Sequence, residues 1–88
     1  MKTAGERIRA ARAMAGISTK DLDRLAGLKP GVSWAVENSA TGNSETKTVD
    51  KIAKVLGLSL DYIVRGDGKP PTANKVKAAV DAAREEAA

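Results

Sequence analysis

Residues 7–18 read RIRAARAMAGIS, and the fold follows from the order of residue types in this stretch. Arginines alternate with isoleucine and alanine as in a basic helix, Gly16 supplies a helix stop, and Ser18 is a preferred residue for capping the next helix. A second short helix, a turn at Gly27 and a third helix that carries Glu37 complete the pattern. This order predicts a helix-turn-helix behind a basic helix, a motif that typically binds duplex DNA.

The composition sets the limits of this interpretation. With 88 residues, 42% of them hydrophobic and 30% charged, the chain is expected to form one small domain with a modest core. It has no cysteine and no histidine, which excludes disulfides, thiolate or imidazole metal sites and catalysis by either side chain. We therefore expect no catalytic residues, no metal site, no cofactor and no enzymatic activity. No apolar run approaches the ~20 residues of a membrane span and no signal peptide is recognised, so a cytoplasmic protein without membrane contact is expected.

The net charge of +4 is unevenly distributed. Residues 1–65 hold eleven Lys or Arg against seven Asp or Glu, whereas residues 66–88 hold four of each. The positive excess therefore lies on the first part of the chain, where an anionic partner would bind. Solubility alone is the alternative explanation for a surplus of this size.

The remaining helices follow from caps and apolar spacing. Thr3 with Glu6 predicts a capping box that opens the first helix. The third helix is expected from Pro30 to about Ser39, with Pro30 at its first position and Val32 and Val36 toward the core. A fourth helix is the best defined, because its apolar residues recur at helical spacing before a glycine stop. They are Val49, Ile52, Ala53, Leu56 and the terminating Gly57.

The last part of the chain divides into a fifth helix, a linker and a tail. Ser59 is expected to cap the fifth helix, and no strand pattern appears anywhere. The predicted organisation is a helix-turn-helix domain over residues 1–67, a proline-containing linker over 68–71 and an amphipathic C-terminal helix over 72–88. The tail has a narrow valine-alanine stripe. It is expected to support dimerisation, and the alternatives are that it lies on the fifth helix, frays or contacts a protein partner.

Residues with characteristic spacings are spread over positions 4–66. They are Arg7-Ile8-Arg9, Arg12, Gly16-Ile17-Ser18, Asp21-Leu22, Gly27, Val36-Glu37, Ile52-Ala53, Leu56-Gly57 and Asp61-Tyr62. On these residues the chain resembles the lambda-repressor and Cro type of helix-turn-helix regulator, the xenobiotic-response-element-like family. The resemblance implies an all-α fold, a five-helix lambda-repressor-like DNA-binding domain with an appended C-terminal helix.

The same resemblance implies how such a domain works. The third helix would enter the major groove of double-stranded DNA, and a homodimer would occupy a palindromic site. The counterparts of Arg12 and Glu37 pair in this family, which would fix the third helix against the first. A solvated or phosphate-facing Arg12 is the alternative. The dimer contact would come from Leu60, Tyr62 and Ile63, although Tyr62 also suits a core position with its hydroxyl at the surface.

The predicted DNA-contacting residues lie at the start of the second helix, on the third helix and in the loop that follows it. They are Thr19, Lys20, Lys29, Pro30, Gly31, Ser33, Trp34, Asn38, Asn43 and Lys47. Solvation without any DNA contact is the alternative for Asn43 and Lys47. Pro30, Gly31 and Ala35 stand where long base-reading side chains are usual, and none of them can make bidentate bonds to a base. Affinity is therefore expected to come mainly from backbone contacts.

Four further positions depart from the family pattern. Thr19 replaces a usual glutamine, and Asp23 replaces a usual alanine, so that its carboxylate must find a donor or lean into solvent. Ser33 stands where an isoleucine or valine would fill the core, and Val32 is expected to fill part of that space. Trp34 either fills the space left by Ser33 or presents an exposed indole to a thymine methyl group, the sugar-phosphate wall or a partner protein.

Two functions of different classes follow. The first is a transcriptional regulator, a repressor of the phage or mobile-element type. The second is a protein-interaction module of the antitoxin or antirepressor type, in which the third helix has lost its base contacts. The carboxylate pairs Asp21 with Asp23 and Glu85 with Glu86 are interpreted as solvated helix faces and not as catalytic pairs.

Overall fold

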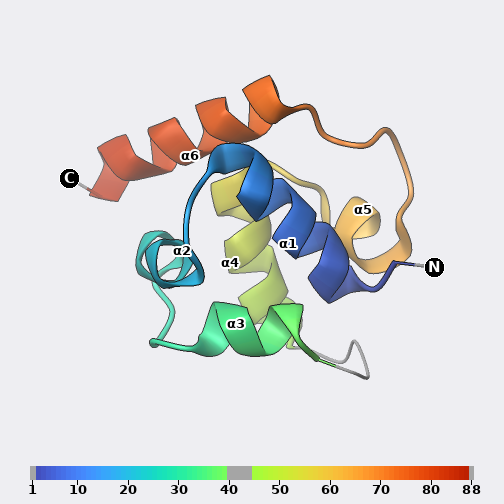
Figure 1. The fold of residues 1–88 in the computed structure, drawn as a ribbon, viewed down its shortest axis with the longest axis horizontal. Helices are drawn as coiled ribbons and strands as arrows, with labels where there is room; N and C mark the ends of the chain where they lie inside the picture. The colour runs from blue at the N-terminus through green and yellow to red at the C-terminus, as the bar shows by residue number, and fades with distance from the viewer. Residues whose placement is uncertain (1, 40–44, 88) are drawn as a thin grey trace.

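The computed structural model describes residues 2–39 and 45–87, and these residues form six α-helices and no strand (Figure 1). The all-α prediction is therefore confirmed. Within these ranges no helix is both long and apolar enough to cross a membrane. The predicted contact Asn43 lies outside the described residues. The helices are α1 (Ala4–Ala15), α2 (Thr19–Ala26), α3 (Val32–Glu37), α4 (Thr46–Leu56), α5 (Leu60–Arg65) and α6 (Ala73–Ala87).

Serine and threonine caps begin four of the helices, and the caps at Thr3, Ser18 and Ser59 are the predicted ones. Each cap is a serine or threonine whose hydroxyl accepts a hydrogen bond from the backbone N–H three residues later, which satisfies one of the unpaired donors of the first turn. The bonds are Thr3 to Glu6 at 3.1 Å, Ser18 to Asp21 at 3.1 Å, Ser59 to Tyr62 at 3.1 Å and Thr72 to Lys75 at 3.3 Å. Local sequence signals therefore set where α1, α2, α5 and α6 begin.

Helix α3 is shorter than predicted. It spans Val32–Glu37, and Pro30 lies in the turn before it instead of at its first position. The reason is Gly31, which precedes the helix with φ of 92°, in the left-handed region that favours glycine. The chain therefore turns sharply at Gly31, and the backbone N–H groups of Gly31 and Ser33 are directed toward Asp23 of α2.

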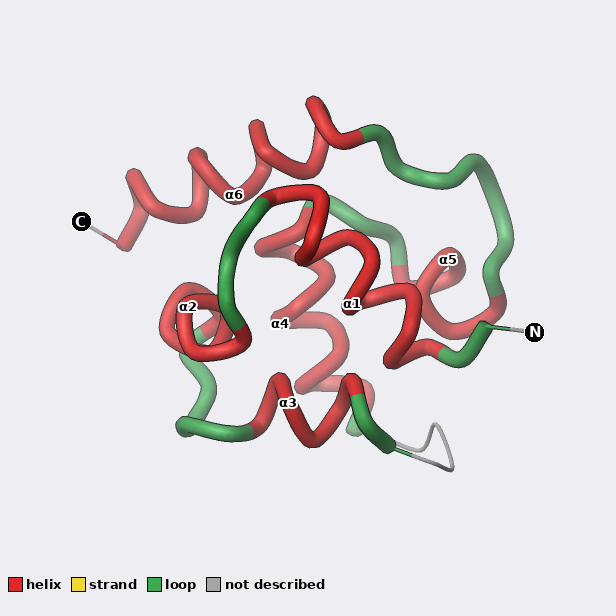
Figure 2. Tube along the Cα trace, viewed as in Figure 1, coloured by secondary structure: helices red, strands yellow, loops and turns green. Residues whose placement is uncertain are grey.

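The core lies between α1 and α4, which occupy the middle of the molecule in Figure 2, with α3 at one edge and α6 at the other. The predicted apolar stripe of α4 is buried, as is Ile8 of α1. Leu22 and Ile63 add side chains from α2 and α5 to the same cluster. Each short helix thus presents a few apolar residues, and the core exists only where they meet.

The C-terminal helix differs from the expectation. Helix α6 packs across α1 and α4 and touches α2, and its Val76 and Val80 belong to the buried core (Figure 1). The two valines of the predicted stripe are therefore covered by the chain itself and are not offered to a symmetry mate. Because the exposed linker 68–71 leads directly back to this core, the tail completes the domain and is not an appendage to it.

Replacing Val80 by alanine is expected to lower the free energy of unfolding by about 2 kcal/mol, because it removes buried methyl groups and leaves a small cavity. Denaturant titration followed by circular dichroism measures this loss. The matched control is Val64→Ala, at a valine that is 58% exposed, where a change below about 0.5 kcal/mol is expected. Equal effects at the two positions would contradict the packing of α6.

Candidate nucleic-acid interface

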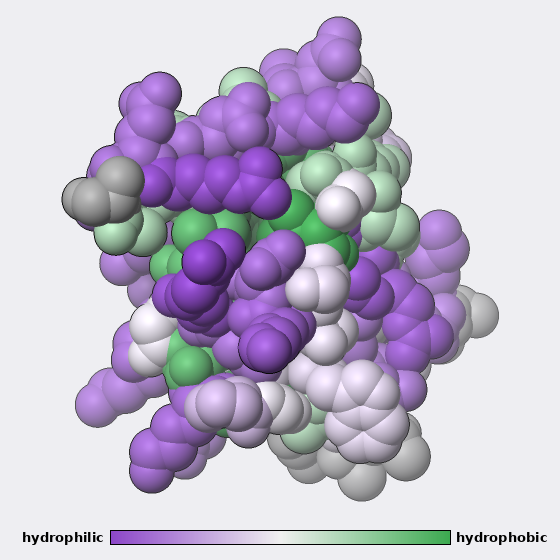
Figure 3. All heavy atoms as spheres, turned by 60° about the vertical axis from the view of Figure 1, so that its left-hand side comes forward, coloured by the Kyte–Doolittle hydropathy of each residue, from purple (hydrophilic) through white to green (hydrophobic). Residues whose placement is uncertain are grey.

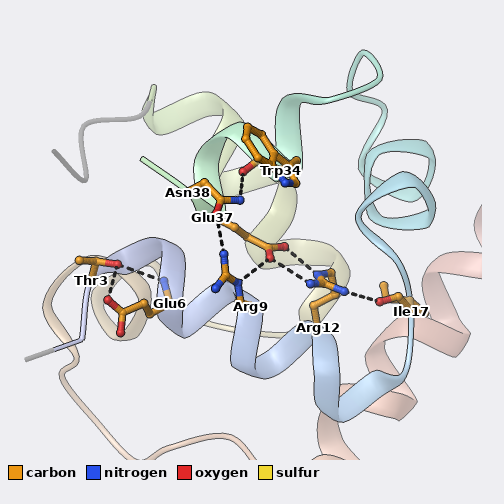
Figure 4. Close-up of polar contacts among 8 residues, drawn as sticks. All are labelled: Thr3, Glu6, Arg9, Arg12, Ile17, Trp34, Glu37 and Asn38. Atoms are coloured by element: carbon orange, nitrogen blue, oxygen red, sulfur yellow. Dashed lines mark hydrogen bonds and ion pairs between the residues drawn. The ribbon is translucent and has the colours of Figure 1, made fainter. Parts of the chain in front are cut away.

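The C-terminal end of α3 is held by an ion pair to α1 (Figure 4). Arg12 Nε lies 2.7 Å from Glu37 Oε2, and Arg12 Nη2 lies 3.1 Å from Glu37 Oε1. The guanidinium therefore binds the carboxylate through two hydrogen bonds. The Glu37 side chain is 1% exposed and the Arg12 side chain 20%. Arg12 Nη1 also donates to the Ile17 carbonyl at 2.8 Å. The predicted pair therefore forms, and Arg12 is not a free charge.

Arg9 extends this contact, a role that its place in the sequence did not predict. Its Nε lies 3.5 Å from Glu37 Oε1, and its Nη2 donates to Asn38 Oδ1 at 2.8 Å. Asn38 Nδ2 in turn donates to the Trp34 carbonyl at 2.8 Å. Asn38, a predicted DNA contact, is exposed but uses its amide within the fold. The sequence did contain one indication of this contact, because Arg9 and Arg12 are three residues apart and therefore share one face of α1.

Glycine at position 5 allows α1 to approach α3 this closely. A Cβ atom at Gly5 would lie 2.5 Å from the Glu37 carbonyl oxygen and 2.6 Å from that of Val36, distances that force the helices apart. The backbone of α1 therefore rests directly on the last carbonyl groups of α3. No local pattern around Gly5 predicted this role.

The N-terminal end of α3 is held by Asp23. Its carboxylate is buried and accepts hydrogen bonds from Gly31 N at 2.9 Å and Ser33 N at 2.7 Å. The carboxylate at this position was expected to need a hydrogen-bond donor, and the donors are these two N–H groups. Asp23 on α2 therefore caps the start of α3. Aspartate is a preferred capping residue, but here the cap comes from eight residues before Gly31. Signals for local caps therefore do not reveal it.

Ser33 is fully buried, and its hydroxyl has no hydrogen-bond partner among the described residues. The prediction that Ser33 contacts DNA is therefore wrong, because the two fixed ends of α3 turn this residue toward the core. Val32 packs partly against the core, as expected from the small volume of Ser33.

Trp34 is 61% exposed, so the alternative that it fills the core is wrong. In Figure 4 its indole points away from the cluster of Arg9, Arg12 and Glu37. Ala35 beside it is also exposed, as are Pro30 and Gly31 in the preceding turn. We call Pro30, Gly31, Trp34 and Ala35 the α3 apolar surface.

The predicted lysine contacts are exposed on elements next to α3. Lys29 directly precedes the α3 apolar surface, and Lys47 lies in the first turn of α4. Lys20 and Pro30 line one hollow of about 360 Å³, which brings the start of α2 beside the approach to α3. Thr19 is half-buried at the start of α2. The structure thus brings Lys20 and Lys29 to the border of the α3 apolar surface.

The predicted dimer residues separate into two groups. Ile63 is fully buried and its carbonyl accepts a hydrogen bond from Arg7 Nη1 at 2.7 Å, so its assignment to a dimer interface is wrong. Leu60 and Tyr62 are half-buried on α5. Tyr62 lines a groove of about 210 Å³ together with the proline-containing linker.

A second groove, of about 300 Å³, lies between α2, α4 and α6. Leu25, Val55 and Ala83 form its apolar part, and Lys51 and Lys54 stand at its edge. Figure 3, in which the left-hand side of Figure 1 is turned forward, shows hydrophobic surface between hydrophilic side chains. The residues of the α3 apolar surface do not line this groove.

Comparisons of the chain with protein-family models, with curated proteins and with solved structures find no match. The assignment of function therefore depends on how α2, α3 and the neighbouring lysines are arranged.

Proposed function

We propose that the chain is a transcriptional regulator that binds duplex DNA with α3 against the major groove, in a lambda-repressor-like domain. The observation that carries this proposal is the fixation of α3 at both ends. Asp23 holds its first turn and Glu37 holds its last turn, while the outer side of the helix remains exposed. A short helix with fixed orientation and a free outer surface suits docking into a groove about 12 Å wide.

The charges next to α3 support the same proposal. Lys20, Lys29 and Lys47 are exposed, and no salt bridge is formed by any of the three among the described residues. Cations beside a groove-docking helix contact phosphates, which position a protein on the duplex without selecting a sequence. In contrast, Arg9 and Arg12 are engaged in holding α3.

The regulator is proposed to act as a repressor of the phage or mobile-element type, as a homodimer on a palindromic operator. The exposed part of α5, with Leu60, Tyr62 and the 58% exposed Val64, supplies an apolar surface for a two-fold contact. A dimer that covers an operator would block the polymerase sterically. Sedimentation of wild-type protein and Val64→Asp tests this contact, because a charge in an apolar seam weakens the dimer.

Affinity for duplex DNA is expected to fall steeply with salt. Each lysine–phosphate contact contributes about −0.9 to the slope of log affinity against log salt, so the three lysines give a slope of about −3 per subunit. The triple variant Lys20→Gln/Lys29→Gln/Lys47→Gln should lose most of this slope. Fluorescence anisotropy of a labelled random duplex, titrated at several salt concentrations, measures both.

The matched control removes the same charge elsewhere. Lys69, Lys75 and Lys77 are exposed in the linker and on α6, which lies at the opposite edge of the molecule from α3 (Figure 1). Their triple glutamine variant should keep the wild-type slope. If both triple variants flatten the slope equally, binding is a property of net charge and does not involve the α3 side of the molecule.

A protein-interaction module of the antitoxin or antirepressor type is the second candidate. The large exposed indole of Trp34 favours it, because exposed tryptophan is enriched at protein interfaces. A gel shift on random duplex at low salt separates the two functions. Retention of the duplex supports DNA binding, and its absence supports a protein partner.

A further inference from the structure

The α3 apolar surface offers almost no hydrogen-bonding group to a base. Of the residues of α3, Ser33, Val36 and Glu37 are buried, while Trp34 and Ala35 are exposed. At the end of the helix, the Asn38 amide accepts a hydrogen bond from Arg9 and donates one of its N–H groups to the Trp34 carbonyl. Among Pro30, Gly31, Trp34 and Ala35, which form the α3 apolar surface, the indole N–H of Trp34 is the single side-chain donor. These four residues cannot match a base edge that demands a paired donor and acceptor.

One feature of the major groove does match an apolar surface. Thymine presents its C5 methyl group there, and among the four bases it is the one with an apolar substituent in the groove. An indole carries a large apolar area and lies flat against such a group. The small residues Pro30, Gly31 and Ala35 around Trp34 leave room for close approach.

We infer that Trp34 selects duplexes by contacting pyrimidine C5 methyl groups in the major groove, so that the ligand class is thymine-bearing DNA. This inference rests on the proposed function. Charge complementarity favours DNA over an apolar protein surface as the occupant. Lys20 and Lys29 border the apolar residues, as phosphates border the methyl groups of a major groove.

The test uses duplexes that differ only in the methyl group. A site is first selected from a random pool, and it is then synthesised with thymine or with uracil at every thymine position. Both duplexes carry the same charge, so phosphate contacts are unchanged. Wild-type protein is expected to bind the thymine duplex about fourfold more tightly for each methyl group contacted. Fluorescence anisotropy of the labelled duplex gives both affinities.

Trp34→Ala is the decisive variant. Because Trp34 is exposed, this variant is expected to fold, which a thermal melt confirms. Its affinities for the two duplexes should become equal while its salt slope stays that of the wild type. Glu85→Ala, which removes an exposed side chain on α6 outside every proposed contact, is the control and should keep the preference for thymine.

The outcomes separate the inference from the function on which it rests. Equal wild-type affinity for thymine and uracil duplexes overturns the inference but leaves the DNA-binding proposal standing. A preference that persists in Trp34→Ala also overturns it, because the methyl group is then recognised by another residue or through the shape of the duplex. Failure to retain any duplex at low salt overturns the proposed function itself.

Discussion

Replacing Arg12 by alanine is expected to lower the free energy of unfolding by about 3–5 kcal/mol, more than the loss expected for Val80→Ala in the core. The substitution leaves Glu37 buried without its main partner, since Arg9 lies 3.5 Å away and is half exposed. It also removes the donor to the Ile17 carbonyl. Urea unfolding, followed by circular dichroism, measures the loss.

The exposed pair between Arg24 and Asp21 supplies the control. Arg24 is also on a short helix and also binds a carboxylate, at 3.3 Å, but its side chain is 71% exposed. Arg24→Ala is expected to cost less than about 1 kcal/mol, because water and salt screen an exposed pair. An Arg12→Ala loss as small as this would show that the contact with Glu37 contributes little.

A double variant distinguishes the cost of leaving Glu37 buried without a partner from the net contribution of the ion pair to stability. Arg12→Met with Glu37→Met replaces both charges with apolar side chains, and such replacements of buried pairs are often nearly neutral. The double variant is therefore expected to be more stable than Arg12→Ala alone. Additive losses would instead indicate that each residue stabilises the fold independently of the other.

Replacing Asp23 by alanine is expected to lower the free energy of unfolding by about 3 kcal/mol, because hydrogen bonds to a charged group are strong and a buried unpaired N–H is costly. The Gly31 and Ser33 N–H groups both lose their acceptor. The first turn of α3 should become the least protected part of that helix. Hydrogen exchange, read at single amides by NMR, resolves this local effect.

Asp50→Ala is the matched control for Asp23. Asp50 is a helical aspartate paired with Lys54 at 3.3 Å, and its side chain is 41% exposed. Its loss is expected to cost about 0.5 kcal/mol. The loss in free energy of unfolding for Asp23→Asn should lie between those for Asp23→Ala and Asp50→Ala. The amide oxygen of asparagine can still accept one of the two hydrogen bonds. If Asp23→Ala leaves exchange in α3 unchanged, the cap does not hold this helix.

Two predicted site residues, Ser33 and Ile63, are buried in the structure, and for Ser33 the cause is the rotation of α3. Helix α3 spans a turn and a half, so a small rotation changes which residues face outward. The sequence placed Ser33 and Trp34 together among the candidate contacts. Asp23 and Glu37 fix the rotation of α3 about its own axis, and this rotation buries Ser33 and exposes Trp34.

The sequence by itself determined the local features of the chain. Caps such as Ser18, stops such as Gly16 and the stripe of α4 are interactions between residues a few positions apart, so their spacing is readable without coordinates. The pair between Arg12 and Glu37 was anticipated through resemblance and not through spacing.

Tertiary structure alone decided how α3 is oriented and where the tail lies. Asp23 caps a helix other than its own, Arg9 reaches Asn38 across α1 and α3, and Val76 and Val80 fill a core built by α1 and α4. These contacts join residues distant in the chain, and each depends on helices already packed at particular angles. Their energies therefore arise from the assembled core, and no local pattern in the sequence encodes them.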